Sequence, residues 1–533
     1  MNTQTLNGDF AFAHGALEAG VRVVSSYPGS PSSGTVKAVL DLTDKDDVHV
    51  EWSTNEKVAF EVGIGASLAG RRSLVCVKSV GMNVLVDPLM TINLCGVNGG
   101  LVILLGDDPG AYGSQNDQDT RSIALYSELP LLEPSTPSEA KSLMVEAFEF
   151  SERFGTAVIV RLTRSFSQQE EVVELAGRRK APALGLKREP YRWLTFPGNA
   201  VEMHARLHDK TATLKSWADE SSRNRVTGAG RRGIIAAGFS AAKLRDVIGD
   251  SQPNLQVLEL VTLFPLPENR IAEFVRSCEE VLVVEENTPF VELQTRALLQ
   301  STEISVPLHG KRDGYLPAQG ELFRWQIQNA LQQFLPDFTP AHSYLAENES
   351  DERPVRHDHC AGCPFPEVID ILQRVAGELG QDPLLVGDPG CLVKAADRLY
   401  TKHAIGSAIA VAQGLVHAEA PERAIALLGD SAFYHTSIPA LLNAVIQRTP
   451  ILMVILDNSG AVTTGSQPTP QNGRDSRGES SPVVRIEDVA RACGVRKIRS
   501  VSQEDGNEIL EEVFREALVW DEPGLVVVER LCD

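Results

Sequence analysis

Two dipeptides in the last third of the chain pair a polar side chain with the end of an apolar run. Gly429-Asp430 follows AIALL, and Asp457-Asn458 follows ILMVIL. Such runs predict buried parallel strands, and open α/β sheets bind ligands at the carboxyl ends of their strands. Asp430 offers a carboxylate, Asn458 an amide oxygen and Gly460 a backbone carbonyl, the hard oxygens that Mg²⁺ prefers. Either dipeptide alone would indicate a turn. The pair, one crossover apart, predicts a magnesium site that holds a diphosphate.

The cysteines form a second group that could do chemistry. Cys360 and Cys363 lie in HCAGCPF, a Cys-x-x-Cys pair that suits a redox disulfide, half a zinc site or half an iron–sulfur site. We expect Cys391 and Cys532 to end the strands LLVGDPGC and GLVVVERLC, which would bring their thiolates to one sheet edge. Four thiolates there would complete a [4Fe–4S] site. A Cys₄ zinc site stays open, a thioredoxin-like pair is less favoured, and Cys493 is an alternative fourth ligand. Small buried hydrophobes are expected at Cys76, Cys95 and Cys278.

Bulk properties narrow the class of protein. The 533 residues exceed one core, so two to four domains are expected. A formal net charge of −21 and the lack of a basic run disfavour nucleic-acid binding. The N-terminal residues do not resemble a targeting signal, and the sequence has no apolar run of membrane-spanning length. Sparse cysteines exclude a disulfide scaffold, so a cytoplasmic location is the default.

Short β-branched runs alternate with helical stretches along the chain. This alternation predicts three α/β segments, whose strands and helices must position these residues. The first runs to about residue 190. A polar stretch from Lys180 to Arg232 is expected as a partly ordered connector before the second, shorter segment. Residues from Leu335 to His357 are rich in Pro, Glu, Asp and Ser, and predict a second linker. The third segment runs from about Cys360 to the end.

Several motifs, in order along nearly the whole chain, resemble one family. They are YPGSPSS at Tyr27, NEKVA at Asn55, DDPGAYGSQNDQDTR from Asp107 to Arg121, GDSAFYH and TGSQPTP at Thr464. The sequence resembles the large (alpha) subunits of indolepyruvate:ferredoxin oxidoreductases, within the thiamine diphosphate-dependent 2-oxoacid:ferredoxin oxidoreductases. The resemblance implies a pyrimidine-binding domain at 1–190, a connector and transketolase C-terminal-like domain at 191–340, and a thiamine diphosphate-binding domain at 355–533.

The resemblance also assigns a catalytic carboxylate. In such enzymes a glutamate hydrogen-bonds N1′ of the cofactor's aminopyrimidine in a dry pocket. Glu56 matches that position, with Glu51 and Glu61 as nearby competitors. Ser53-x-x-Glu56 is also a capping box at a helix start, which is the structural alternative.

Further roles follow from the same resemblance. Arg121 is expected to face the substrate carboxylate, although a surface ion pair would explain it as well. His435 is expected to orient the diphosphate or act as an acid or base, against an ordinary structural role. Ser30 and Ser32 could donate hydrogen bonds to substrate, or belong to a plain Pro-Gly turn. The residues implied to bind the cofactor are Tyr27, Pro28, Gly29, Ser30, Glu56, Gly429, Asp430, Ser431, Asn458, Thr464 and Gly465.

The implied activity is oxidative decarboxylation of a 2-oxoacid to its acyl-coenzyme A, with an aryl-pyruvate such as indolepyruvate or phenylpyruvate as substrate. Cofactors would be thiamine diphosphate, Mg²⁺ and a [4Fe–4S] cluster that takes ligands from Cys360, Cys363, Cys391 and Cys532, with coenzyme A as co-substrate. Partners would be a smaller gamma-type (beta) subunit and ferredoxin or another acceptor, in a hetero-oligomer with a dimeric core.

Two departures from the family qualify this expectation. The chain stops at Asp533, without the family's C-terminal ferredoxin-like domain, and Phe365 stands where a His is expected. Two other functions stay open. One is a non-oxidative thiamine-dependent decarboxylase or carboligase, and the other is a non-catalytic scaffold subunit.

Overall fold

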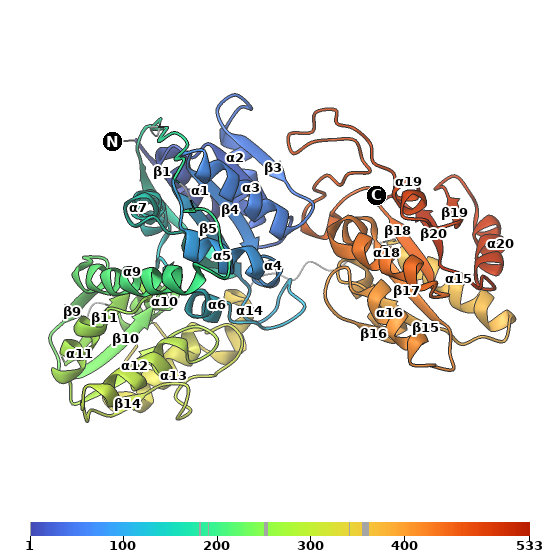
Figure 1. Cartoon of the computed structure of the whole chain (residues 1–533). Helices are drawn as coiled ribbons and strands as arrows, with labels where there is room; N and C mark the ends of the chain where they lie inside the picture. Colours follow the sequence, from blue (N-terminus) through green and yellow to red (C-terminus); the bar gives the residue numbers. More distant parts are fainter. Residues whose placement is uncertain are drawn as a thin grey trace. The chain divides into compact units, whose positions relative to one another are not determined.

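The computed structural model describes residues 2–180, 183–189, 191–249, 254–340, 342–353 and 362–532. The chain forms two compact units. The first holds residues 1–50 and 56–356, and the second holds residues 51–55 and 357–533. Figure 1 labels many of the elements of each unit. In the described residues, no helix combines the length and apolarity needed to cross a membrane.

The first unit begins with a seven-stranded sheet in the order β12-β6-β7-β5-β4-β2-β3. Pairs β2–β4, β4–β5, β5–β7 and β6–β7 are parallel, and β12, contributed by the later part of the unit, pairs antiparallel with β6. The strands are β2 (Val23–Ser26), β3 (His49–Trp52), β4 (Ser73–Lys78), β5 (Leu101–Asp107), β6 (Leu131–Leu132), β7 (Val158–Thr163) and β12 (Thr262–Phe264). The helices are α1 (Gly8–Glu18), α2 (Ser33–Leu42), α3 (Glu56–Leu68), α4 (Ser79–Val84), α5 (Val86–Cys95), α6 (Arg121–Ser127), α7 (Pro137–Phe154) and α8 (Arg164–Gln168). A separate antiparallel pair joins β1 (Asn2–Asn7) and β8 (Glu170–Leu175).

A five-stranded sheet in the order β14-β13-β10-β11-β9 completes the first unit. Only its edge strand β9 is antiparallel to its neighbour. The strands are β9 (Arg225–Gly228), β10 (Arg232–Ala237), β11 (Leu255–Leu260), β13 (Glu280–Val284) and β14 (Leu308–His309). The helices are α10 (Phe239–Ile248), α11 (Glu268–Arg276), α12 (Phe290–Ser301) and α13 (Arg324–Phe334), followed by the short η1 (Ala346–Asn348) and α14 (Glu349–Glu352).

The stretch from Lys180 to Arg232, expected as a partly ordered connector, holds more regular structure than its composition indicates. Helix α9 (Ala200–Glu220) has 21 residues there. Its buried side chains, Met203, Leu207, Leu214 and Ala218, recur at helical spacing. They pack α9 against α5 and α11 of the same unit. A sparse apolar stripe was hidden by the polar composition of the whole stretch.

The second unit is built on a six-stranded, wholly parallel sheet in the order β16-β15-β17-β18-β20-β19. The strands are β15 (Leu384–Gly387), β16 (Thr401–Lys402), β17 (Ala424–Gly429), β18 (Leu452–Asp457), β19 (Lys497–Val501) and β20 (Gly524–Glu529). The helical segments are α15 (Phe365–Glu378), η2 (Cys391–Arg398), α16 (Ala408–His417), α17 (Asp430–Ala432), η3 (Phe433–Ser437), α18 (Ile438–Gln447), η4 (Val462–Thr464), α19 (Ile486–Ala492) and α20 (Asn507–Ala517).

Both faces of this sheet are buried. Alternate strand residues pack against α15 and α20 on one face and against α16, α18 and α19 on the other. Helices α15 and α20 lie side by side (Figure 1). Coverage on both faces explains why the strands read as continuous apolar runs. The predicted α/β fold with parallel sheets is confirmed.

Candidate cofactor site

The chemistry-bearing residues of the second unit follow four adjacent strands. Cys391 lies after β15, Asp430 after β17, Asn458 after β18 and Cys532 after β20, and these strands are neighbours in the sheet. The cysteines lie beyond the strands rather than at their ends, because β15 ends at Gly387 and β20 at Glu529. All four side chains still come from one carboxyl edge, as predicted for a ligand site.

The Asn458 amide joins two groups at this edge. One end lies 3.6 Å from Cys391 Sγ and 3.5 Å from Cys532 Sγ, as an N–H donor to both sulfurs. The other end lies 3.3 Å from Asp430 Oδ1 and 3.0 Å from the Gly460 carbonyl oxygen. With the nitrogen toward the sulfurs, three oxygens converge without a proton between them. Exchanging the two amide atoms would satisfy Asp430 and Gly460 directly.

We favour the oxygen on the Asp430 side, because three converging oxygens are what a hard divalent cation needs. Mg²⁺ binds oxygens at about 2.0–2.1 Å in octahedral geometry, so adjacent ligands lie roughly 3 Å apart. The distances of 3.3 and 3.0 Å match that spacing. The residues predicted for Mg²⁺ therefore fit the ion.

The Asp430 carboxylate is held in place by its surroundings. It is buried, Thr469 Oγ1 donates to it at 3.1 Å, and the backbone N–H groups of Ser431 and Gly460 also donate. Burial, followed by the nearby charge of Asp457, raises the pKa of Asp430 to about 7. A carboxylate that is costly to ionise alone gains most from a bound cation.

Predicted cofactor residues beyond Asn458 form a tight loop. Thr464 Oγ1 donates to Gln467 Oε1 at 2.6 Å, and Gly465 has a φ of +112°, which favours glycine. Gln471 donates to the buried Asp457. Thr469 and Gln471 were not predicted as site residues, although both lie within or just beyond the TGSQPTP motif that marked the loop.

His435 is buried in η3, a π-helical segment from Phe433 to Ser437 that follows Asp430. Its Nδ1 lies 3.2 Å from Thr436 Oγ1. Single π-helical turns are frequent at functional sites. A role for His435 toward the diphosphate stays a prediction.

The two faces of the sheet separate the candidate cluster ligands. Cys363 and Cys391 pack against the core on the α15 face, whereas Cys493 packs against the core on the α18 face. Cys532 lies on the same side as Cys391, because both sulfurs contact the Asn458 amide. Cys360 lies outside the described residues. This arrangement favours Cys532 over Cys493.

The expectation of small buried hydrophobes holds for two of the three remaining cysteines. Cys76 is buried in β4 and Cys278 belongs to the main core of the first unit, whereas Cys95 is only partly buried and packs against that core. Phe365 is buried as the first residue of α15, so it serves the core where relatives were expected to carry a His.

In the first unit, Glu56 is the first residue of α3 and is buried. The capping-box alternative is wrong, because the helix begins at Glu56 itself and the Ser53 hydroxyl donates to Glu51 Oε1 at 2.7 Å. Gly81 in α4 lies against the Glu56 carboxyl. A Cβ at Gly81 would lie 2.4 Å from Glu56 Oε1, so only glycine leaves room for that side chain.

The YPGSPSS loop follows β2 and is ordered by its own hydrogen bonds. Ser32 Oγ donates to the Gly29 carbonyl at 3.0 Å, and the Gly29 N–H donates to Ser33 Oγ at 2.7 Å. The Lys78 side chain packs on Gly29. Lys78 ends β4 and was not predicted; burial lowers its pKa, opposed by the charges of Asp108 and Glu56. The loop, Lys78 and Glu56 thus share one region of the first unit.

Arg121 begins α6, and protein groups surround its guanidinium. Nε and Nη2 bind Asp119 at 2.9 and 2.6 Å, Nη1 binds Glu285 at 2.9 Å, and Nη2 also reaches the carbonyls of Glu286 and Thr288. Asp119 and Glu285 raise the pKa of Arg121 despite its burial. The expected contact with a substrate carboxylate has no support here, because two protein carboxylates already hold Arg121 between the two sheets of the unit.

Comparisons with known proteins confirm that the fold is of the predicted thiamine diphosphate-enzyme type. Residues 14–225 match the family described as "Pyruvate flavodoxin/ferredoxin oxidoreductase, thiamine diP-bdg", and residues 393–530 match "Thiamine pyrophosphate enzyme, C-terminal TPP binding domain". A solved 2-oxoglutarate:ferredoxin oxidoreductase from Magnetococcus marinus is similar in fold, with a TM-score of 0.51 and 16% identity over 62% of this chain and 65% of that one.

Curated relatives match over nearly the whole chain. "Indolepyruvate oxidoreductase subunit IorA" of Archaeoglobus fulgidus is 36% identical over 99% of this chain and 86% of its own length. The subunit of the same name from Methanothermobacter thermautotrophicus is 35% identical with the same coverage of both chains. The chain therefore belongs to the family of indolepyruvate oxidoreductase IorA subunits, enzymes of the 2-oxoacid:ferredoxin oxidoreductase family with thiamine diphosphate-binding domains.

Proposed function

We propose that this subunit catalyses oxidative decarboxylation of an aryl-pyruvate to its acyl-coenzyme A, and passes the electrons through a [4Fe–4S] cluster to a partner. The observation that carries the proposal is the Asn458 side chain. Its one amide lies between a set of oxygens suited to Mg²⁺ and the sulfurs of Cys391 and Cys532. A cation–diphosphate site without redox chemistry does not need two cysteines at the same amide.

Thiamine diphosphate, when bound, supplies the electron sink for decarboxylation. Asp430, Asn458 and Gly460 would hold the cation that carries its diphosphate. Glu56 would hold a proton at its carboxyl toward the aminopyrimidine, in the position that Gly81 keeps open. Cys360, Cys363, Cys391 and Cys532 would ligate the cluster, and the amide of Asn458 would donate to two of the sulfurs.

The finer parts of the proposal have different support. The aryl-pyruvate substrate is suggested by the printed names of the IorA relatives. Coenzyme A is bound in the solved 2-oxoglutarate:ferredoxin oxidoreductase of similar fold. The smaller partner subunit, the ferredoxin-type acceptor, the dimeric core and the cytoplasmic location are proposed from the family resemblance. A substrate role for Arg121 is not included.

The test is anaerobic co-purification with the smaller subunit, followed by iron and sulfide analysis and turnover with indolepyruvate, coenzyme A and a dye acceptor. We expect about four iron and four sulfide per chain, as for one [4Fe–4S] cluster, and turnover that needs both coenzyme A and thiamine diphosphate. Full activity in an iron-free protein would instead identify a non-oxidative decarboxylase. A cofactor-free complex with activity unaltered by Glu56→Gln would identify a scaffold subunit.

A further inference from the structure

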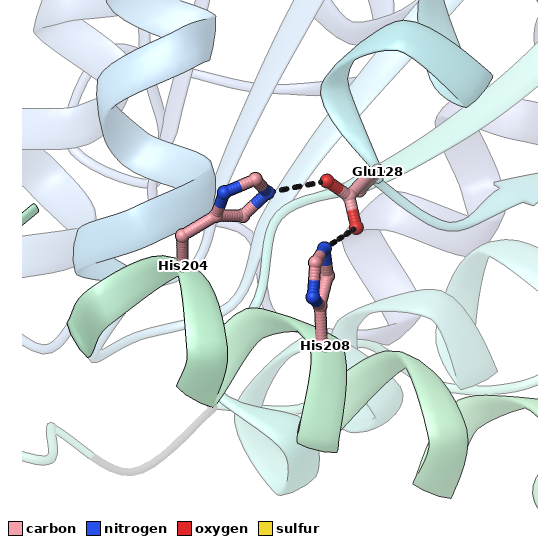
Figure 2. A group of neighbouring side chains, drawn as sticks. All are labelled: Glu128, His204 and His208. Carbon is pink, nitrogen blue, oxygen red and sulfur yellow. Dashed lines mark hydrogen bonds and ion pairs between the residues drawn. The ribbon is translucent and has the colours of Figure 1, made fainter. Parts of the chain in front are cut away.

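A group of metal-binding side chains lies in the first unit, in a part of the chain that the proposed reaction does not use. Glu128, His204 and His208 place one ligand atom each within 4.8 Å of one another. His204 Nε2 lies 2.8 Å from Glu128 Oε1, and His208 Nε2 lies 3.4 Å from Glu128 Oε2. Figure 2 shows both imidazoles turned toward the same carboxylate. We propose that these three side chains bind a divalent transition-metal ion, with Zn²⁺ as the best fit.

The two histidines are arranged by α9. Positions 204 and 208 are one helical turn apart, so their rings project from one face. Two histidines with this spacing are a recurrent way for a helix to offer two imidazole ligands to zinc. The ring centroids of His204 and His208 lie 4.4 Å apart. Helix α9 is anchored by its buried stripe and by Lys210, whose amine donates to the Gly155 carbonyl at 2.9 Å. The pair is therefore presented on a fixed element.

The carboxylate is placed by the end of α6. Glu128 is the residue after that helix and has left-handed backbone angles, φ 54° and ψ 32°. Its N–H donates to the carbonyls of Ala124 and Leu125. Glycine is favoured at such a position, and any other residue carries a conformational cost there. A glutamate does not favour these backbone angles, so the reason for a glutamate at position 128 is sought in its side chain.

The ligand set identifies the class of ion. Two imidazoles and one carboxylate form the protein ligands of several zinc sites that leave a fourth position open. Bond lengths of about 2.0–2.2 Å place tetrahedral ligands roughly 3.3 Å apart, near the His208–Glu128 separation. The side chains of His204, His208 and Glu128 are 51%, 61% and 25% exposed. A hydrated ion can therefore reach them, and the imidazole rings have room to adjust to it. Mg²⁺ and Ca²⁺ are disfavoured, since they select oxygen ligands.

A bound ion would fasten α9 to the end of α6. Helix α6 begins at Arg121, which is tied to the second sheet, and α9 leads from the first sheet of the unit to the second. A bound ion would cross-link α9 and the end of α6 in the folded state, so we expect it to raise the unfolding temperature. The site is separate from the residues assigned to thiamine diphosphate and to the cluster, so its test does not depend on the proposed reaction.

The test compares zinc binding in the intact chain and four single variants after removal of loosely bound metal by chelation. Equilibrium dialysis against Zn²⁺ gives the bound equivalents, and thermal unfolding with and without Zn²⁺ gives the shift in melting temperature. We expect His204→Ala and His208→Ala to bind about one equivalent less than the unmodified chain and to lose the zinc-dependent rise in melting temperature. Glu128→Gln should weaken binding by about tenfold or more.

Arg206→Ala is the matched control, since Arg206 is exposed on the same helix and pairs only with Glu202 in the described contacts. It should bind zinc like the unmodified chain. Any zinc that enters the cysteines is common to all five proteins and cancels in the comparison. Equal zinc content in the unmodified chain and both histidine variants would overturn the proposal, and so would an equal loss in Arg206→Ala. Unchanged melting temperatures of the metal-free variants confirm that the comparison is between folded proteins.

Discussion

Arg121 and Asn458 are both buried polar residues in motifs that suggest ligand binding, yet their surroundings are opposite in kind. The Arg121 guanidinium meets two carboxylates and two carbonyls, which are complementary partners. The Asn458 oxygen meets two other oxygens, which are not. Complementary partners indicate a group that completes the fold. Incompatible partners at a strand edge indicate a group that waits for a ligand. The difference teaches that a site is better recognised by unmatched polar atoms than by motif alone.

The largest expected effect concerns Glu56, another buried residue in these motifs. Replacing it by glutamine keeps its shape but removes the carboxyl that would hold the cofactor's proton. General acid–base groups contribute about 10²–10⁴-fold to rate. We therefore expect turnover of the purified complex to fall by that factor, with an unchanged melting temperature. Loss of folding stability together with activity would place Glu56 with Arg121 as a structural residue.

Gly81 offers a second route to the same carboxylate. A methyl group there would meet Glu56 Oε1 at 2.4 Å, so Gly81→Ala should displace the carboxyl without changing its chemistry. Gly65 in the same helix as Glu56 has open space around it and supplies the control, Gly65→Ala. We expect a roughly 10²-fold loss of turnover in the first variant, as for an ångström-scale misplacement of a catalytic group. Equal turnover in the two variants would contradict this placement of Glu56.

Arg121→Met should act on stability. It leaves Asp119 and Glu285 buried without their cation, and breaking a buried ion pair in this way costs about 3–5 kcal/mol. Chemical denaturation of the intact chain, followed through the first unit, should report this loss. Arg206→Met removes an exposed ion pair of the same unit and should change little. A raised KM for the 2-oxoacid with unchanged stability would restore Arg121 as a substrate ligand.

Asp430→Asn should stabilise the cofactor-free protein, whereas Arg121→Met should destabilise it. The amide no longer adds a costly buried charge to converging oxygens, so the cofactor-free protein should gain about 0.5–2 kcal/mol, as when other functional strain is relieved. Bound thiamine diphosphate, measured after gel filtration in Mg²⁺, should be lost. If Asp430→Asn is destabilised and still retains the cofactor, Asp430 serves the fold, as Arg121 does, and not ligand binding.

The smallest expected effect is a difference in iron content between variants of Cys391 and Cys493. Cys391→Ser removes a sulfur beside Asn458, whereas Cys493→Ser changes a residue on the other face of the sheet. Iron content should fall several-fold in the first variant, because each iron of the cluster takes one cysteine ligand, and should not change in the second. Equal iron loss in both would remove the distinction between the two faces.

Sequence could predict the six-stranded sheet of the second unit and its ligand-binding edge, because the information is local. Each of Cys391, Asp430, Asn458 and Cys532 follows its own apolar strand, and parallel topology brings strand ends together. It could not predict the state of Arg121, because Glu285 lies 164 residues away, just after β13 of the five-stranded sheet. Nor could it predict α9, whose four buried residues are diluted among charged ones. The capping box at Ser53 failed because its motif does not fix where the helix begins.

The central claim is that one amide, Asn458, separates the cation site from the cluster. It is tested most directly by replacing Mg²⁺ with Mn²⁺ in the anaerobic complex and measuring the electron spin relaxation of Mn²⁺ before and after reduction of the cluster. We predict faster relaxation of Mn²⁺ on reduction, because a paramagnetic cluster would lie beside the ion. The effect should be absent in Cys391→Ser preparations that lack the cluster. Relaxation of bound Mn²⁺ that stays the same when a fully loaded cluster is reduced would contradict the claim.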